Sequence, residues 1–250
     1  MPFTPSHTVA ILPFLRTPLA PAAMVLGAMA PDLPYFLPGH IPRSLTHSLD
    51  GVLTVDLAVG VVAFALWLLV LRAPALDYSP AWLRERMPPQ ARWRVRGLVI
   101  SGLLVAVAVV LGILTHLFLD LFTHEGGFLS EIAPWTDDRV GPWAAANLVH
   151  AAVSVVTTGL LVWWTHRWAQ RTPRTPRPTG VSSRERVVTW IALLALLVVI
   201  GAARWIWGIQ VQERAPLNSS LLGVSFFVAA SWTGLVALVL AVVWRLRKVA

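Results

Sequence analysis

Five long apolar segments constrain the fold of this chain more than any other feature of its sequence. Each is long enough for an α-helix to cross the hydrocarbon core of a bilayer, which takes about 20 apolar residues. They cover residues 51–71, 98–122, 143–165, 187–208 and 221–243. Hydrophobic residues make up 56% of the chain and charged residues only 13%, which is unlike an ordinary soluble domain. The sequence therefore predicts a single all-α integral membrane domain over residues 1–250, a polytopic transmembrane helical bundle.

The positive charges are unevenly distributed, and their positions predict the orientation of the chain. The net charge is +8, and most arginines lie in the segments 72–96, 167–186 and 245–248. The positive-inside rule places all three in the cytoplasm and explains the charge better than nucleic-acid binding does. The acidic loop 124–142 then faces outside. Residues 171–183, rich in Pro, Thr and Arg, are expected to form a flexible cytoplasmic linker.

The source and compartment are indicated by composition. Nearly all of the cations are arginine, and Ala, Pro and Val are abundant, which suggests a bacterium with a GC-rich genome. We therefore expect the protein in the bacterial cytoplasmic membrane, with its C-terminus in the cytoplasm.

The first 50 residues do not contain a comfortable membrane span. Their two apolar patches, residues 9–15 and 19–30, are short and interrupted by prolines. We interpret residues 1–50 as an N-terminal capping or re-entrant hairpin over the outer mouth of the bundle. Such a segment is tolerated at membrane depth only where protein or a water-filled cavity covers it. The alternative is one additional span across residues 9–30, which would place the N-terminus in the cytoplasm.

A stripe of ionisable residues ends the second span. His116, Asp120 and His124 are spaced i, i+4 and i+8, so they lie on one face of a helix. Ionisable side chains are costly in a membrane and need partners, and imidazole with carboxylate is a good ligand set for zinc-like ions. His116 and His124 are about 12 Å apart along the axis, whereas Asp120 could bind ions on both sides. The alternative is an interfacial histidine beside a hydrogen-bonded His–Asp pair.

Other candidate ligands come from distant parts of the chain. His7, Asp32 and His47 lie in the N-terminal region, and His150 lies near the start of the third span. Asp32 could instead cap a helix or turn, and His150 could be a hydrogen-bonded residue of the bundle. Arg204, in the fourth span, either extends to the membrane interface or binds a substrate phosphate. The absence of cysteine excludes thiolate ligands.

The order of these residues resembles a bacterial membrane family, domain of unknown function 4184. It is also similar to the YdjM-like membrane-bound metal-dependent hydrolases. More distantly, it is similar to zinc-dependent phospholipase C and the S1/P1 nucleases, which hold three zinc ions and cleave phosphate esters. The motifs that carry the resemblance are His7, Ala-Pro-Asp32, Thr-His47-Ser and His116-x-x-x-Asp120-x-x-x-His124.

The distant resemblance implies how the ions would be held. The ligands of a first zinc ion would be Asp32, His47, His116 and Asp120. Asp120 would bridge to a second ion bound by His124 and His150, and His7 would bind a third ion with the N-terminal amine. The chain departs from the soluble enzymes twice, because it begins Met1-Pro2 where they have Trp, and Ser154 replaces a carboxylate.

Together these features predict a membrane-bound hydrolase that uses a divalent metal, zinc or alternatively manganese, with one to three ions. The expected substrate is a phosphate ester on a lipid or lipid-linked molecule at the outer membrane face, and no nucleic acid. His47, His116 and Asp120 are the expected catalytic residues, with metal-activated water as the nucleophile. The alternative is a non-enzymatic membrane protein whose metal site is structural. A transporter fits less well, because transport sites lie near the bilayer midplane.

Overall fold

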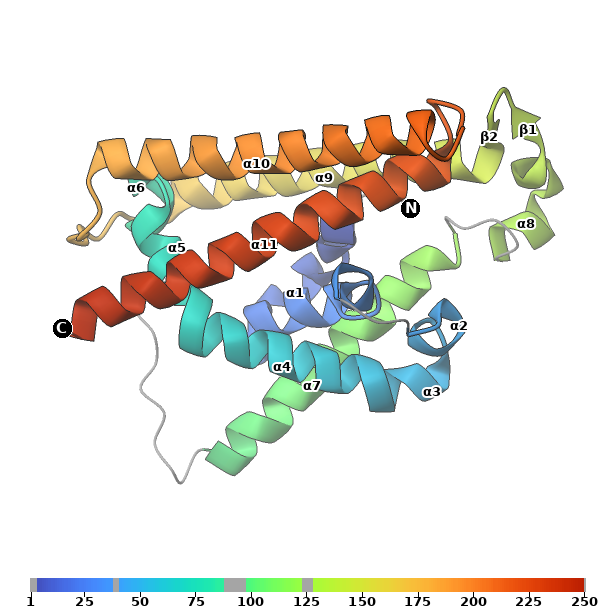
Figure 1. Cartoon of the computed structure of the whole chain (residues 1–250). Coiled ribbons are helices and arrows are strands. Elements are labelled where there is room, and N and C mark those ends of the chain that lie inside the picture. The colour runs from blue at the N-terminus through green and yellow to red at the C-terminus, as the bar shows by residue number, and fades with distance from the viewer. Residues whose placement is uncertain (1–3, 38–40, 88–97, 123–127, 250) are drawn as a thin grey trace. The chain divides into compact units, whose positions relative to one another are not determined.

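The computed structural model describes residues 4–37, 41–87, 98–122 and 128–249 (Figure 1). The chain divides into two compact units. The first comprises Met1–Phe64 and Gln90–Thr165, and the second comprises Ala65–Pro89 and His166–Ala250. The candidate ligands with described positions all belong to the first unit.

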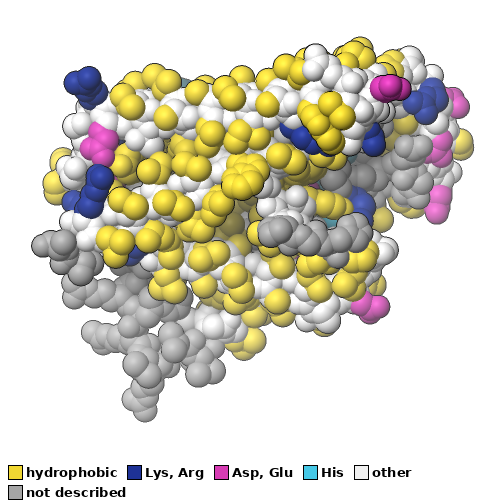
Figure 2. All heavy atoms as spheres, in the orientation of Figure 1, with side chains coloured by type: hydrophobic (Ala, Val, Ile, Leu, Met, Phe, Trp, Pro, Cys, Tyr) yellow, Lys and Arg dark blue, Asp and Glu magenta, His cyan; other side chains and the backbone are white. Residues whose placement is uncertain are grey.

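Within the described residues, five helical segments are long and apolar enough to cross a membrane, which confirms the predicted all-α polytopic bundle. Many of their large apolar side chains are exposed, and Figure 2 shows hydrophobic side chains spread over the surface in view. Lipid is the natural surrounding for such a surface, and the chain is an integral membrane protein. The segments are Leu49–Tyr78, Ser101–Asp120, Ala145–Arg171, Ser183–Gln210 and Ser220–Lys248.

The first unit holds the N-terminal elements and two of the spanning helices. Its early elements are the 3-10 helix η1 (Thr4–Arg16), α1 (Pro21–Met29), the 3-10 helix η2 (Leu33–Phe36), α2 (Arg43–Thr46), α3 (Leu49–Gly51), the π-helix η3 (Val52–Asp56) and most of α4 (Leu57–Leu66). Its later elements are α7 (Leu98–Asp120), α8 (Phe128–Ile132), the 3-10 helix η6 (Pro134–Asp137), strands β1 (Arg139–Val140) and β2 (Trp143–Ala144), and most of α9 (Ala145–Arg171). The two short strands form an antiparallel hairpin.

The second unit is built mainly from two long helices that pack along each other. They are α10 (Ser183–Gln210) and α11 (Ser219–Val249), and the remaining elements are the π-helix η4 (Trp67–Leu71), α5 (Arg72–Tyr78) and α6 (Ala81–Arg84). The Arg245 side chain ties α11 to η4 by donating to the Val70 carbonyl at 2.9 Å. In the segment between α9 and α10, the amide of Thr175 donates to the Glu85 carbonyl at 2.8 Å.

The N-terminal hairpin consists of η1 and α1, which pack against each other and against α7 (Figure 1). With 13 and 9 residues, neither is long enough to cross a bilayer. Pro13 lies within the first element, and Pro21 is the first residue of the second, a position that proline favours. The hairpin therefore brings N-terminal residues onto α7, and neither of its helices is among the candidate spans of the described residues.

Two glycines allow the backbones of α1 and α7 to approach closely. A Cβ atom at Gly27 would collide with the carbonyl of Val109, and one at Gly112 would collide with the carbonyl of Met24. Small residues at helix contacts have this role in membrane proteins generally. Because Gly112 lies one turn before His116, the close approach carries the His116 ring up to the backbone of α1.

We expect Gly112→Ala to reduce the free energy of unfolding by about 1–3 kcal/mol, the usual cost of overpacking. Gly102→Ala is a matched control on the same helix, because its added Cβ meets no described atom within 4 Å. It should leave stability unchanged or slightly raised. Unfolding of both variants in detergent micelles measures the difference. Equal stability would contradict the close packing of α1 on α7.

The predicted orientation can be tested with single cysteines, since the native chain has none. Glu131 and Thr175 are both exposed and lie in the predicted outer and cytoplasmic segments. In intact cells, an impermeant maleimide should label Glu131→Cys. It should label Thr175→Cys only after the cells are lysed. The opposite pattern would place the cytoplasmic side where we expect the outer side.

Candidate metal centre

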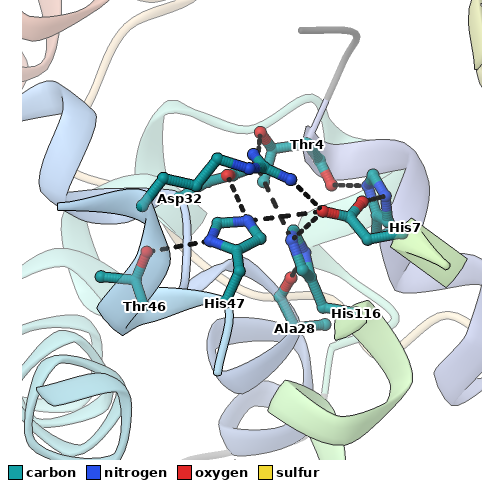
Figure 3. A network of polar contacts seen from close by, with 9 residues as sticks. Thr4, His7, Ala28, Asp32, Thr46, His47 and His116 are labelled. Atoms are coloured by element: carbon teal, nitrogen blue, oxygen red, sulfur yellow. Dashed lines mark hydrogen bonds and ion pairs between the residues drawn. The ribbon is translucent and has the colours of Figure 1, made fainter. Parts of the chain in front are cut away.

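Six histidine and aspartate side chains gather inside the first unit and form two groups of three. The first group is Asp32, His47 and His116, and the second is His7, Asp120 and His150. Within each group, the candidate ligand atoms lie within 4.8 Å of one another. The side chains are buried or nearly so, and His116 is fully inaccessible. Figure 3 shows His7, His47 and His116 directed toward a shared space.

The local structure explains how separate segments supply these ligands. Asp32 precedes η2, and His47 follows the short helix α2. His116 and Asp120 lie one turn apart on α7, so their side chains share a face. The second group adds His7 from η1 and His150 from α9.

Asp120 connects the two groups. Its Oδ1 atom lies 3.2 Å from the Nε2 atom of His7. Its Oδ2 atom lies 3.4 Å from Nε2 of His47 and 3.6 Å from Nε2 of His116. Each carboxylate oxygen therefore faces a different group, which is the arrangement expected of a bridging ligand.

Backbone carbonyls orient two of the histidines. The Nδ1 atom of His116 donates to the Ala28 carbonyl at 2.8 Å, and Nδ1 of His7 donates to the Thr4 carbonyl at 3.3 Å. A carbonyl oxygen only accepts hydrogen bonds, so Nδ1 carries the proton, and a neutral His116 presents its Nε2 lone pair to the carboxylates. Nε2 of His7 is itself at hydrogen-bond distance, 3.2 Å, from Oδ1 of Asp120. Metal-binding histidines are held in this way. A lone pair facing a carboxylate is favourable only with a second proton or a cation between them.

The distances in the first group fit ligands that share an ion. Nε2 of His47 lies 3.5 Å from Oδ1 of Asp32, and Nε2 of His116 lies 4.0 Å from Oδ2 of the same residue. These separations exceed the about 2.7–3.2 Å of N–H···O hydrogen bonds. They are nearer the about 3.4 Å between two ligands of a tetrahedral zinc ion with bonds of about 2.1 Å.

Three atoms of this group lack hydrogen-bond partners. They are Nε2 of His47, Nε2 of His116 and Oδ1 of Asp32. No described residue forms a hydrogen bond with any of these three atoms. Buried polar atoms are costly when left unsatisfied. A divalent cation would satisfy all three, so the residues present fit such an ion.

The electrostatic surroundings act differently on Asp32 and His47. Burial raises the pKa of Asp32, but the nearby imidazoles of His47 and His116 and a hydrogen bond from Thr4 outweigh it, and the pKa falls to about 2. Burial lowers the pKa of His47, but the nearby carboxylates of Asp120 and Asp32 outweigh it and raise that pKa, so a proton competes with a metal ion for His47. Asp32 is therefore ionised at neutral pH, as an anionic ligand must be.

The sequence analysis missed several residues that contact the centre. Arg43 Nη2 donates to Asp120 Oδ2 at 2.8 Å, and Thr4 Oγ1 donates to Asp32 Oδ2 at 2.7 Å. Arg43 lies four residues before His47, a spacing that could have indicated it. Thr4 carries no comparable signal. Asp56 is fully buried in the π-helix η3 but belongs to neither group.

The remaining predicted ligands have different outcomes. His124 and Met1 lie outside the described residues. The binding of a second ion by His124 and the binding of a third ion by the N-terminal amine therefore stay predictions. Among the described residues, the structure groups His7 with Asp120 and His150. Ser154 and His150 line a cavity of about 10 Å³ beside His7, which is room for about one water molecule.

Arg204 belongs to the second unit. Its guanidinium carbon lies 4.6 Å from the centroid of the Trp207 ring, a cation–π contact. The predicted binding of a substrate phosphate by Arg204 stays a prediction.

The fold and the site define a polytopic helical membrane protein with a buried cluster of histidine and aspartate. The chain belongs to the family described as Domain of unknown function (DUF4184), whose model matches residues 1–244. This confirms the family expected from the sequence motifs. Neither a curated protein nor a solved structure matches the chain. The similarity to YdjM-like hydrolases, phospholipase C and S1/P1 nucleases therefore stays a prediction.

We expect the purified protein to hold at least one equivalent of zinc or manganese, and Asp120→Asn to lose most of it. The substitution keeps the side chain's size but removes the charge that both groups share. Asp50→Asn is the matched control, because Asp50 is exposed and belongs to neither group. Elemental analysis measures the metal, and circular dichroism checks the helical fold. Unchanged metal in both Asp120→Asn and His116→Ala would contradict a metal centre.

Proposed function

We propose that the protein is a membrane-bound, metal-dependent hydrolase of a phosphate ester on a lipid or lipid-linked substrate. The observation that carries the proposal is Asp120, whose two oxygens face two separate buried ligand groups. The arginine distribution supports a site at the outer face of a bacterial cytoplasmic membrane. Phospholipid head groups and lipid-linked phosphates are the phosphate esters concentrated at such a surface.

The ligand set suits hydrolysis without a serine or cysteine nucleophile. Paired divalent ions held by these ligands would activate water and would stabilise both the attacking and the leaving oxygen of a phosphoryl displacement. A water oxygen forms the new bond to phosphorus, the ester P–O bond breaks, and the leaving alcohol takes up a proton. In this proposal His47, His116 and Asp120 hold the ions, and the carbonyl of Ala28 fixes the ring of His116.

Access to the centre favours catalysis. His47 and Asp120 line a cavity of about 420 Å³, a volume within the range of small-molecule sites, about 300–1,000 Å³. Catalytic zinc sites keep one coordination position open, whereas structural sites are closed. A cavity that reaches two candidate ligands provides space for a substrate at that position.

The alternative is a non-enzymatic membrane protein with a structural metal. The complete burial of His116 and the near-complete burial of Asp32 favour it, since closed sites are typically structural. Metal binding alone does not distinguish the two possibilities, whereas turnover of a substrate does.

We expect metal-loaded protein to hydrolyse at least one member of a panel of phospholipids, lipid-linked phosphates and simple phosphate esters. Loss of a residue that only hydrogen-bonds to a metal ligand costs about 10–100-fold in activity. His47 is itself a candidate ligand, so His47→Ala should lower kcat/KM by more than about 100-fold. His166→Ala is the control, because His166 is exposed and lies outside both groups. Release of phosphate or of the alcohol measures the rate. Full metal occupancy without turnover of any panel member would favour the structural alternative.

A further inference from the structure

The cavity beside the centre has a polar end and an apolar wall, and both lie in the first unit. Its polar end is formed by Arg43, His47 and Asp120. Its apolar wall is formed by Leu49, Leu114, Leu117, Phe118 and Leu121. A ligand that fills this cavity needs an anionic group at one end and a hydrocarbon portion at the other.

Apart from Leu49, the apolar wall is a stripe of α7 and the residue that follows it. Leu114, Leu117, Phe118 and Leu121 are spaced i, i+3, i+4 and i+7, so they lie on one side of the helix. Phe118 is 59% exposed, and Leu114 and Leu121 are exposed as well. Most of the stripe belongs to the candidate span Ser101–Asp120. It therefore extends from apolar membrane depth to Asp120, at the edge of the centre.

Arg43 supplies the positive charge at the polar end. Its guanidinium donates to Oδ2 of Asp120, the oxygen that also faces His47 and His116. A divalent cation held by Oδ2 would compete for the same lone pairs and would repel the guanidinium. An anion between the cation and Arg43 removes that repulsion. A phosphate suits the position, because its oxygens match the planar fork of an arginine. The side chain has room to respond, since 35% of it is exposed.

We propose that this cavity binds a lipid phosphate, with its phosphate between Arg43 and the metal centre and its hydrocarbon chain along the stripe of α7. This inference rests on the metal centre of the proposed function and adds two elements to it. Arg43 is the residue that binds the substrate's phosphate, and the wall from Leu114 to Leu121 selects esters that carry a long chain. The chain enters from the bilayer, so the substrate need not leave the membrane.

The test is the binding of inorganic phosphate, butyl phosphate and octyl phosphate to the full-length, metal-loaded protein in a neutral detergent. Each buried methylene is worth about 0.8 kcal/mol of transfer free energy, which is about fourfold in affinity. Octyl phosphate should therefore bind at least about 50-fold more tightly than butyl phosphate, after partition into empty micelles is subtracted. Titration calorimetry measures each Kd, and elemental analysis measures the metal in every sample.

Three variants separate the ends of the cavity. Arg43→Gln should weaken all three ligands by about tenfold or more while the metal content stays unchanged. Phe118→Ala and Leu114→Ala should weaken octyl phosphate and leave inorganic phosphate unchanged. The matched controls are Arg16→Gln and Leu103→Ala, both exposed in the first unit and outside the cavity, and they should bind like the native chain.

The outcomes distinguish this inference from the proposed function. Metal-loaded protein that binds all three ligands equally, or that is insensitive to Arg43→Gln, overturns the lipid-phosphate site and leaves the metal centre intact. Protein that binds no metal overturns both. The double variant with Phe118→Ala and Leu114→Ala is the last test. If it still binds octyl phosphate much more tightly than butyl phosphate, the hydrocarbon chain lies elsewhere and the inference is overturned.

Discussion

Asp120 makes the contacts on which the rest of the candidate centre depends. It joins His7 of the N-terminal hairpin to His47 and His116, and it accepts a hydrogen bond from Arg43. An ionised carboxylate in apolar surroundings must be neutralised by its neighbours. The guanidinium of Arg43 provides part of that compensation. The Nε2 lone pair of a neutral His116 faces the same carboxylate, so a cation between them would supply the rest. One charge therefore both holds the segments together and creates a position that suits a divalent cation.

The hairpin of η1 and α1 shows how the N-terminal region contributes to the site, although neither of its helices is among the candidate spans of the described residues. Gly27 and Gly112 bring α1 against α7, and this contact places the carbonyl of Ala28 at Nδ1 of His116. The same hairpin carries His7, and Asp32 follows it directly. The hairpin and the residue after it thus bring two candidate ligands and one orienting carbonyl to a spanning helix.

Hydropathy alone predicted the class of fold and the number of spans, because apolar length is the dominant signal in such a chain. The helix ends were predicted less well. The span predicted at 143–165 continues to Arg171, and the span predicted at 187–208 begins at Ser183. Both helices continue into turns that contain arginine. Arginine lowers the mean hydropathy of these turns, so hydropathy does not assign them to the span.

The candidate site was predictable where residue type and spacing carry information. The i, i+4 pair of His116 and Asp120 shares a face of α7, as its spacing indicates. Bringing Asp32 and His47 to that pair required a family resemblance, since no periodicity links residues so far apart. The carbonyl of Ala28 has no sequence signal at all. Arg43 does not belong to any metal-ligand pattern, because its guanidinium is always protonated and has no lone pair to offer an ion.

Two divalent ions sharing Asp120 can be located directly by anomalous X-ray scattering at the zinc edge from crystals of zinc-loaded protein. We predict two peaks about 3.5–4 Å apart. One should lie about 2.0–2.2 Å from the ligand atoms of Asp32, His47 and His116, with Asp120 between it and a second peak beside His7 and His150. Density without a peak near Asp120, with the imidazoles hydrogen-bonded directly to the carboxylates, would contradict the metal centre.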